Sequence, residues 1–406
     1  MVAIQVEDYL RPGIASASPY DARHHDFAWR HRELDRLMSN ECPLPPSPTV
    51  IAAAMAALQI SNFYPNSGED LRTAIARFND VEPDSVILGN GSTEVLDVVT
   101  RAFVGPGDEV VISVPTYAFF ESQTRLYGGE PLLIPMTDDF RFDVPAIVDA
   151  VNERTKAIFL CSPNNPTGNS WTEAELETVL AAGVPTIVDQ AYLECGWAPS
   201  FAPLVARHPN LIVTRTMSKA FGLAALRLGY GIASPTLVDA FLRLRIPFSL
   251  SLVALRAGLA AMTHPGELEE RRTFIATERE RVFEAVRELP GVVPFPSEGN
   301  FILIDVSGTG RTSGEIVEFA RRENMLLRAM TAHRLKDAFV RVTIGTIEQN
   351  DRFLDVFARA LAGGPYVEAP ADTGGAMTRH VEPDLPEGFA TPRPADGPVV
   401  AGTPRS

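Results

Sequence analysis

Residues 216–222 read Thr-Met-Ser-Lys-Ala-Phe-Gly, and residues 226–230 read Leu-Arg-Leu-Gly-Tyr. An apolar run precedes the first stretch and another begins inside the second, so both stretches are expected at the ends of buried strands. They bring together a hydroxyl (Ser218), an amine (Lys219) and a guanidinium (Arg227). A single lysine in a polar segment is usually a solvated charge, so its interpretation depends on its neighbours.

Two polar stretches upstream supply those neighbours. Residues 164–168 read Asn-Asn-Pro-Thr-Gly, and residues 188–192 read Val-Asp-Gln-Ala-Tyr. Alone, the first is a turn by composition, and an aspartate after a strand is often a helix cap. An amide (Asn165), a carboxylate (Asp189) and a phenol (Tyr192), followed in order by the serine, lysine and arginine, make a chance arrangement improbable.

This ordered set resembles the fold-type I aminotransferases, and within them the histidinol-phosphate aminotransferase-like group, from about residue 20 to residue 364. The resemblance implies pyridoxal 5'-phosphate (PLP) as cofactor. Such enzymes need an amine that holds the aldehyde as a Schiff base and later moves the Cα proton, and an acid that keeps the pyridine nitrogen protonated. Lys219 would supply the amine and Asp189 the acid. The others would contact cofactor oxygens: Tyr192 and Asn165 the ring 3'-oxygen, and Ser218 and Arg227 the phosphate.

A glycine turn at residues 89–94, Gly-Asn-Gly-Ser-Thr-Glu, forms the expected second half of the phosphate site. It joins a short apolar strand to a helical pattern, and the start of a helix offers free N–H groups to an anion. Taken alone, the pattern is better explained by an ordinary strand–helix turn with Ser92 or Thr93 as the cap. A dinucleotide site is excluded because the third glycine of that motif is missing. The resemblance assigns Gly91, Ser92 and Thr93 to the PLP phosphate.

Two tyrosines complete the cofactor site by resemblance. Tyr117 follows the strand expected at 109–113 and corresponds to the family's tyrosine that stacks on the pyridine ring. Tyr64 corresponds to a tyrosine that reaches the phosphate of the neighbouring subunit, which implies a homodimer. A core or interface aromatic is the plain alternative for both, and for Tyr64 the two interpretations are about level.

The candidate substrate anchor is Arg341, on an alternating strand pattern at 339–345. A guanidinium binds a carboxylate or phosphate bidentately, which a lysine cannot do. The resemblance gives this arginine the substrate's α-carboxylate or phosphate, adds Asn300 from the segment that closes over the substrate, and adds Tyr20. Arg328 is a weaker companion, for which a surface salt bridge is slightly favoured.

Composition agrees with an intracellular globular enzyme. The chain has 406 residues, 45% hydrophobic and 21% charged, enough for a large and a smaller domain. A net charge of −15 argues against nucleic-acid and acidic-membrane partners. The three cysteines show no metal or disulfide spacing. We expect a cytoplasmic protein, since the sequence shows neither a signal pattern nor a run long enough to span a bilayer.

The order of patterns predicts an α/β fold-type I architecture. Residues 1–45 form an arm, 46–245 a large PLP-binding domain with a mostly parallel, helix-covered sheet, 246–364 a smaller α+β domain, and 365–406 a proline-rich disordered tail. Cofactor residues fall just after the strands, at the edge where such sheets bind ligands. The expected strands are 86–88, 109–113, 157–161, 186–189, 211–216 and 228–233, then 292–295, 301–305, 325–328 and 339–343.

Several residues depart from the family on the substrate side. Residues 40–48 read Asn-Glu-Cys-Pro-Leu-Pro-Pro-Ser-Pro, where the family usually has Asn-Glu-Asn-Pro-Tyr-Gly-Pro-Ser-Pro. Gln190 stands for a usual glutamate, Cys195 for a phenylalanine, Thr93 for an aspartate, and 247–251 lacks the usual asparagines. The retained cofactor residues predict a PLP enzyme whose donor need not be histidinol phosphate.

Three functions stay open from the sequence. The leading one is amino transfer between an L-amino acid, or an amino-alcohol phosphate, and a 2-oxo acid. A PLP-dependent decarboxylation, elimination or oxidative deamination on the same scaffold is the alternative, because these reactions differ in pocket geometry. A non-enzymatic sensor is disfavoured, since the N-terminal arm shows no helix-turn-helix pattern.

Overall fold

The computed structural model describes residues 9–11, 13–14, 17 and 21–363. The predicted tail at 365–406 and the candidate Tyr20 lie outside these residues. No helix in the described part is long and apolar enough to cross a membrane.

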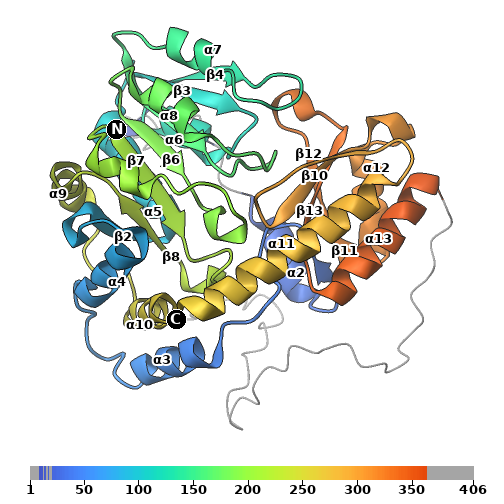
Figure 1. Cartoon of the computed structure of the whole chain (residues 1–406), viewed down its shortest axis with the longest axis horizontal. Coiled ribbons are helices and arrows are strands. Elements are labelled where there is room, and N and C mark those ends of the chain that lie inside the picture. Colours follow the sequence, from blue (N-terminus) through green and yellow to red (C-terminus); the bar gives the residue numbers. More distant parts are fainter. Residues whose placement is uncertain (1–8, 12, 15–16, 18–20, 364–406) are drawn as a thin grey trace, which may run out of the picture. The chain divides into compact units, whose positions relative to one another are not determined.

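A seven-stranded sheet organises the larger part of the chain (Figure 1), with strand order β2-β8-β7-β6-β5-β3-β4. Strand β8 is antiparallel to both neighbours, and the other pairs are parallel. The expected mostly parallel α/β sheet is therefore confirmed. The strands are β2 (Val86–Asn90), β3 (Glu109–Val114), β4 (Glu130–Pro135), β5 (Thr155–Cys161), β6 (Thr186–Asp189), β7 (Leu211–Thr216) and β8 (Leu228–Ile232). Edge strand β4 was missed, because two prolines interrupt its pattern.

Helices cover both faces of this sheet, and β3 shows why. All six of its residues are buried, so its continuous apolar run belongs to a strand covered on two sides. Val110 and Ile112 enter one core and Val111 enters the other. The helices of this part are α3 (Pro48–Leu58), α4 (Glu69–Asn79), α5 (Gly91–Phe103), α6 (Phe119–Leu126), α7 (Val144–Asp149), α8 (Glu173–Leu180), α9 (Pro235–Leu244) and α10 (Leu252–Thr263).

A four-stranded antiparallel sheet, of order β12-β13-β10-β9, forms the second part. Its strands are β9 (Val293–Phe295), β10 (Phe301–Asp305), β12 (Arg328–Met330) and β13 (Phe339–Thr343), covered by α12 (Ser313–Arg322) and α13 (Ile347–Ala362). Thr–Glu and Thr–Gln capping boxes start these two helices. In Figure 1, α11 (Pro265–Arg287) runs from beside α10 to beside α13. The domain boundaries stay a prediction.

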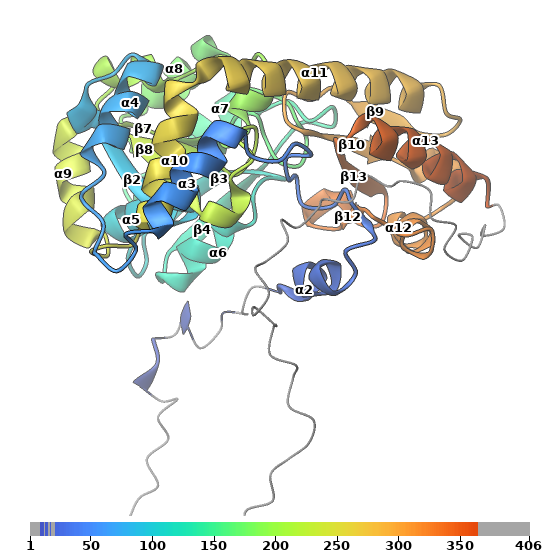
Figure 2. The same cartoon turned by 90° about the horizontal axis from the view of Figure 1, so that it is seen from below.

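The N-terminal arm joins the second part. After α2 (Arg23–Arg30), the strand β1 (Asp35–Arg36) pairs in parallel with β11 (Met325–Leu326). The single strand expected at 325–328 was wrong, because β11 ends at this pairing and β12 begins a separate antiparallel pairing with β13. The chain then crosses to α3, which lies beside α10 (Figure 2).

Candidate active site

Lys219 lies just beyond the carboxyl end of β7, half-buried. Its Nζ donates to the main-chain oxygens of Asn40 at 2.9 Å and Ser39 at 3.3 Å, and lies 5.4 Å from the centre of the Tyr192 ring. Burial, helped by the positive charge of Arg341, lowers the pKa of Lys219 to about 8. Near neutral pH a useful fraction of this amine is therefore uncharged and nucleophilic.

Asp189 ends β6, the strand beside β7, and is 3% exposed. Its Oδ1 accepts a hydrogen bond from Thr214 at 2.9 Å. Burial raises the pKa of Asp189 to about 6. In the described part of the chain no basic side chain forms an ion pair with it, so a cationic ring nitrogen would supply the missing partner.

The Tyr192 hydroxyl sits between two amides that donate to its oxygen, Asn40 Nδ2 at 3.0 Å and Asn165 Nδ2 at 3.3 Å. Burial raises the pKa of this phenol, so it keeps its proton. Because the oxygen accepts two hydrogen bonds, its proton is left to donate to a third group. Such a donor suits the 3'-oxygen of PLP.

Arg341 lies on β13 of the small sheet, and its guanidinium reaches Asn165 beside the Tyr192 hydroxyl. Its Nη1 donates to Asn165 Oδ1 at 2.5 Å and its Nη2 to the main-chain oxygen of Met38 at 2.8 Å. The guanidinium also lies 5.5 Å from the centre of the Phe301 ring. The structure thus brings together residues 176 positions apart in sequence.

The phosphate candidates meet at the start of α5. Gly91 has φ +76°, and a Cβ there would lie 2.5 Å from Arg227 Nη2. Arg227 Nη1 donates to Ser218 Oγ at 3.2 Å, and buried Ser92 follows Gly91. The side chain of the N-cap residue Asn90 makes no capping hydrogen bond to the start of this helix. A space that a Cβ would fill, bordered by amides, hydroxyls and a guanidinium, fits a phosphate dianion.

Sequence reasoning missed Gly229, which shapes this cradle from β8. A Cβ at Gly229 would lie 2.1 Å from the main-chain nitrogen of Ser92 and 2.5 Å from the carbonyl carbon of Gly91. Only glycine therefore lets the helix start approach the strand. The register pairs Gly229 with Gly89, and this contact between distant strands leaves no local signal in the sequence.

The remaining predicted residues lie in different surroundings. Tyr117 is half-buried, with its ring stacked on Phe119 at 5.7 Å. Tyr64 is 84% exposed and packs on exposed Phe248 at 4.9 Å. Asn300 is fully buried and donates to the main-chain oxygens of Asn40 and Glu41, at 3.1 and 3.2 Å. Among the described residues no donor reaches its Oδ1.

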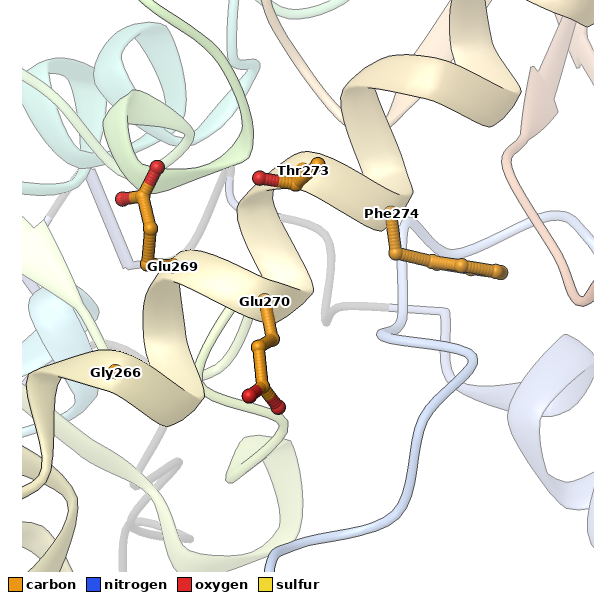
Figure 3. A pocket seen from close by; sticks show the side chains of 5 residues that line it. All are labelled: Gly266, Glu269, Glu270, Thr273 and Phe274. Carbon is orange, nitrogen blue, oxygen red and sulfur yellow. The ribbon is translucent and has the colours of Figure 1, made fainter.

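A surface hollow of about 520 Å³ lies outside this constellation (Figure 3). Its lining side chains, including Glu269, Glu270 and Phe274, all come from α11. None of the predicted cofactor or substrate residues takes part in it. The predicted site at the sheet edge is therefore separate from this hollow.

The chain is similar to known proteins over most of its length. Residues 33–357 match the model of the family "Aminotransferase class I and II". The chain is 38% identical, over 80% of its length and 88% of the other's, to a histidinol-phosphate aminotransferase of Methanosarcina barkeri. The structure resembles that of histidinol-phosphate aminotransferase from Sinorhizobium meliloti in complex with pyridoxal-5'-phosphate, with a TM-score of 0.80 and 26% identity over 87% of this chain and 98% of that one.

A decarboxylase shares the architecture. The L-threonine-O-3-phosphate decarboxylase of Porphyromonas gingivalis superposes with a TM-score of 0.70 and 22% identity, over 81% of this chain and 99% of that one. At this identity the likeness shows the fold alone.

Proposed function

The chain belongs to the family of class I and II aminotransferases, and from this premise we propose that Lys219 is the centre of amino transfer from an anionic donor. The protein is a PLP-dependent aminotransferase, and its substrates are an amino donor and a 2-oxo acid. One observation carries the assignment of the centre: the Lys219 amine, the Tyr192 phenol and the buried carboxylate of Asp189 converge at one edge of the sheet.

Each residue has a distinct task. PLP, when bound, would supply an aldehyde carbon that is electrophilic toward amines and a ring that withdraws electrons from the donor's Cα. Asp189 keeps the ring nitrogen protonated, and Lys219, with its pKa lowered to about 8, takes the proton from Cα and returns it. The other residues hold the cofactor: Tyr192 and Asn165 at the 3'-oxygen, Tyr117 at the ring, and Gly91, Ser92, Thr93, Ser218 and Arg227 at the phosphate.

A pair of arginines supports an anionic donor. Arg341 on β13 and Arg328 on β12 stand directly opposite each other in the antiparallel register. Like charges in this arrangement repel unless an anion lies between them. Arg328 is exposed and forms no ion pair within the described residues. The donor therefore carries net negative charge, from a phosphate or from a carboxylate beyond the α-carboxylate of an amino acid. Histidinol phosphate, named in the relatives, is one candidate. Asn300 is proposed to close over it.

The test is the visible absorption spectrum of the PLP-bound protein with single donors: histidinol phosphate, glutamate, aspartate and a neutral amino acid. We expect an anionic donor to bleach the cofactor band and a 2-oxo acid to restore it. Release of carbon dioxide or ammonia without that return would instead support the alternative reactions. Arg328→Gln should weaken the anionic donor about tenfold and leave the neutral one unchanged.

A homodimer belongs to the same proposal. The aromatic pair Tyr64 and Phe248 is 84% and 62% exposed. Met55 and Leu58 on α3 and nearby Phe63 are also 62%, 58% and 67% exposed. Large apolar side chains exposed in this number within residues 55–64 are typical of a subunit interface. Tyr64 would then reach the phosphate held by the other subunit.

Mixing two variants tests this. Lys219→Ala and Tyr64→Ala each impair every site of their own homodimer. A hybrid dimer has one site with both native residues, so random mixing should recover about a quarter of wild-type activity. A monomer at working concentration, or no recovery in a verified hybrid, would contradict the shared site.

A further inference from the structure

Asn40 lies in the segment that crosses from β1 to α3, and none of the tasks above includes it. It is 1% exposed. Its φ is +53°, in the left-handed region that asparagine and glycine tolerate better than other residues. A buried polar side chain in such a conformation indicates that its surroundings hold it there.

The contacts of Asn40 on the large-sheet side reach two residues of the active site. Its Nδ2 donates to the Tyr192 hydroxyl at 3.0 Å. Its main-chain oxygen accepts from Lys219 Nζ at 2.9 Å. The same residue thus touches the phenol through its side chain and the amine through its backbone.

Its contacts on the small-sheet side are just as direct. The main-chain nitrogen of Asn40 donates to Thr343 Oγ1 at 2.9 Å, and that hydroxyl donates to Asn40 Oδ1 at 3.2 Å. Asn300 Nδ2 donates to the main-chain oxygen of Asn40 at 3.1 Å. Thr343 lies on β13, two positions from Arg341. Asn40 therefore links the strand of the substrate anchor to the phenol and the lysine.

We propose that Asn40 is a positioning residue, which directs the Tyr192 hydroxyl and provides a main-chain acceptor for the Lys219 amine whenever that amine is free. By donating to the phenol oxygen, the Asn40 amide leaves the phenol proton to point at the cofactor. The link to Thr343 fixes the amide in this orientation. This inference rests on the roles proposed above for Lys219 and Tyr192.

Charged and titratable groups from several elements surround Lys219. Each of them contributes to the pH at which the Lys219 nitrogen titrates, so the effect of an Asn40 variant is the difference from the wild type. They are Arg341 on β13, Arg227 after the short helix Ala224–Leu226, Cys195 in the short helix Leu193–Cys195, Glu41 beside Asn40, Asp189 at the end of β6, Tyr192, and His25 on α2. A new carboxylate at residue 40 would add a negative charge to those of Glu41 and Asp189 near the Lys219 amine.

The experiment compares Asn40→Asp and Asn40→Gly with Asn324→Asp and Asn324→Gly. Asn324 is a matched control because it is also an asparagine with positive φ, +58°, and lies after α12 outside the site. The readouts are the pH at which the visible band of the bound cofactor changes, and kcat and KM for the best donor. Both Asn40 replacements tolerate the left-handed backbone.

Asn40→Asp should move the pH of the band change upward by about one unit, because a carboxylate stabilises the protonated nitrogen at Lys219. Asn40→Gly keeps the main-chain oxygen and loses only the amide, so kcat should fall about tenfold with KM within about twofold. The Asn324 variants should change neither readout. Thr343→Val removes the hydroxyl that donates to Asn40 Oδ1, so kcat should fall about threefold. This variant tests the positioning role if an Asn40 variant does not fold.

Two outcomes overturn the inference. In the first, the wild type shows a cofactor band, but both Asn40 variants match the Asn324 variants in kcat and in the pH at which the band changes. The positioning role of Asn40 would then be wrong, and the proposed active site would stand. If the wild type binds no PLP at Lys219, the proposed site fails and the inference fails with it.

Discussion

The edge of the seven-stranded sheet and the segment 38–45 that crosses it build one site by different means. At the sheet edge each functional side chain follows a strand, as Asn165 follows β5, Asp189 ends β6 and Lys219 follows β7. The crossing segment contributes main-chain oxygens and one amide, which hold those side chains in place. The sheet edge thus supplies reactive groups, and the crossing segment supplies their geometry.

The strongest test of the sheet edge is Lys219→Ala. Without the amine no side chain can hold the cofactor covalently or move the Cα proton, so kcat should fall by about 10⁴-fold or more. The shift in the visible spectrum that depends on the lysine should also vanish. Lys156→Ala is the matched control, since Lys156 is exposed and, among the described residues, its amine donates only to the main-chain oxygen of Glu153. Retained activity in Lys219→Ala would refute the centre of the site.

The sheet edge could be predicted from sequence because its signals are local. About ten consecutive residues are enough to recognise a buried strand that ends at a polar residue. The predicted ends of the strand that closes with Asp189 and of the strand before Lys219 lie within a residue of the observed ends. The contacts of Asn40 with Thr343 and Tyr192 span 303 and 152 positions. Tertiary packing alone creates such contacts, so no local pattern could have revealed them.

Asp189→Asn separates catalysis from stability at the sheet edge. An amide cannot hold a proton on the ring nitrogen, so kcat should fall about 10²- to 10³-fold. Thr214 can still donate to the amide oxygen, which keeps the fold intact. Activity within tenfold of the wild type would show that the ring nitrogen does not depend on Asp189.

In the cofactor-free protein the same Asp189→Asn replacement should raise stability near neutral pH, although it lowers kcat in the PLP-bound enzyme. Burial raises the pKa of Asp189 from 3.8 to about 6, so its stabilising contribution is complete below pH 4 and is lost as pH rises through 6. The loss is roughly 3 kcal/mol in the free energy of unfolding. Thermal midpoints of cofactor-free Asp189→Asn should therefore exceed the wild type at pH 8 and match it near pH 4. A lower midpoint at pH 8 would contradict the buried, unpaired carboxylate.

Gly229 is an exception within the large sheet, because its role there is non-local. In Gly229→Ala the new Cβ would meet the Ser92 nitrogen, so the start of α5 must move and the affinity for PLP should fall about 10- to 100-fold. Gly231→Ala on the same strand is the control, since its Cβ would meet side chains of Val95 and Ile87 instead. Both should lower the thermal midpoint, and only the first should change PLP affinity in a titration. Equal losses would remove Gly229 from the phosphate site.

The smallest expected effect belongs to Gln190, whose difference from the family glutamate suggested a changed substrate. The Gln190 side chain makes its hydrogen bonds with Arg215, Phe201 and Pro199, and none with Lys219 among the described residues. Its Oε1 accepts from buried Arg215 and from the Phe201 nitrogen, at 3.1 and 3.2 Å. Its Nε2 donates to the Pro199 oxygen at 2.8 Å, while Arg215 already pairs with buried Glu194.

Gln190→Glu should therefore cost stability without changing specificity. The variant loses the donor to Pro199 and adds a second buried carboxylate beside one guanidinium, which should lower the free energy of unfolding by about 1–2 kcal/mol. The ratio of kcat/KM between two anionic donors should change less than about twofold, whereas Arg328→Gln should change donor preference about tenfold. A tenfold shift in donor ratio from Gln190→Glu would mean that packing behind the sheet edge reaches the substrate, and the division between reactive groups and their support would no longer hold.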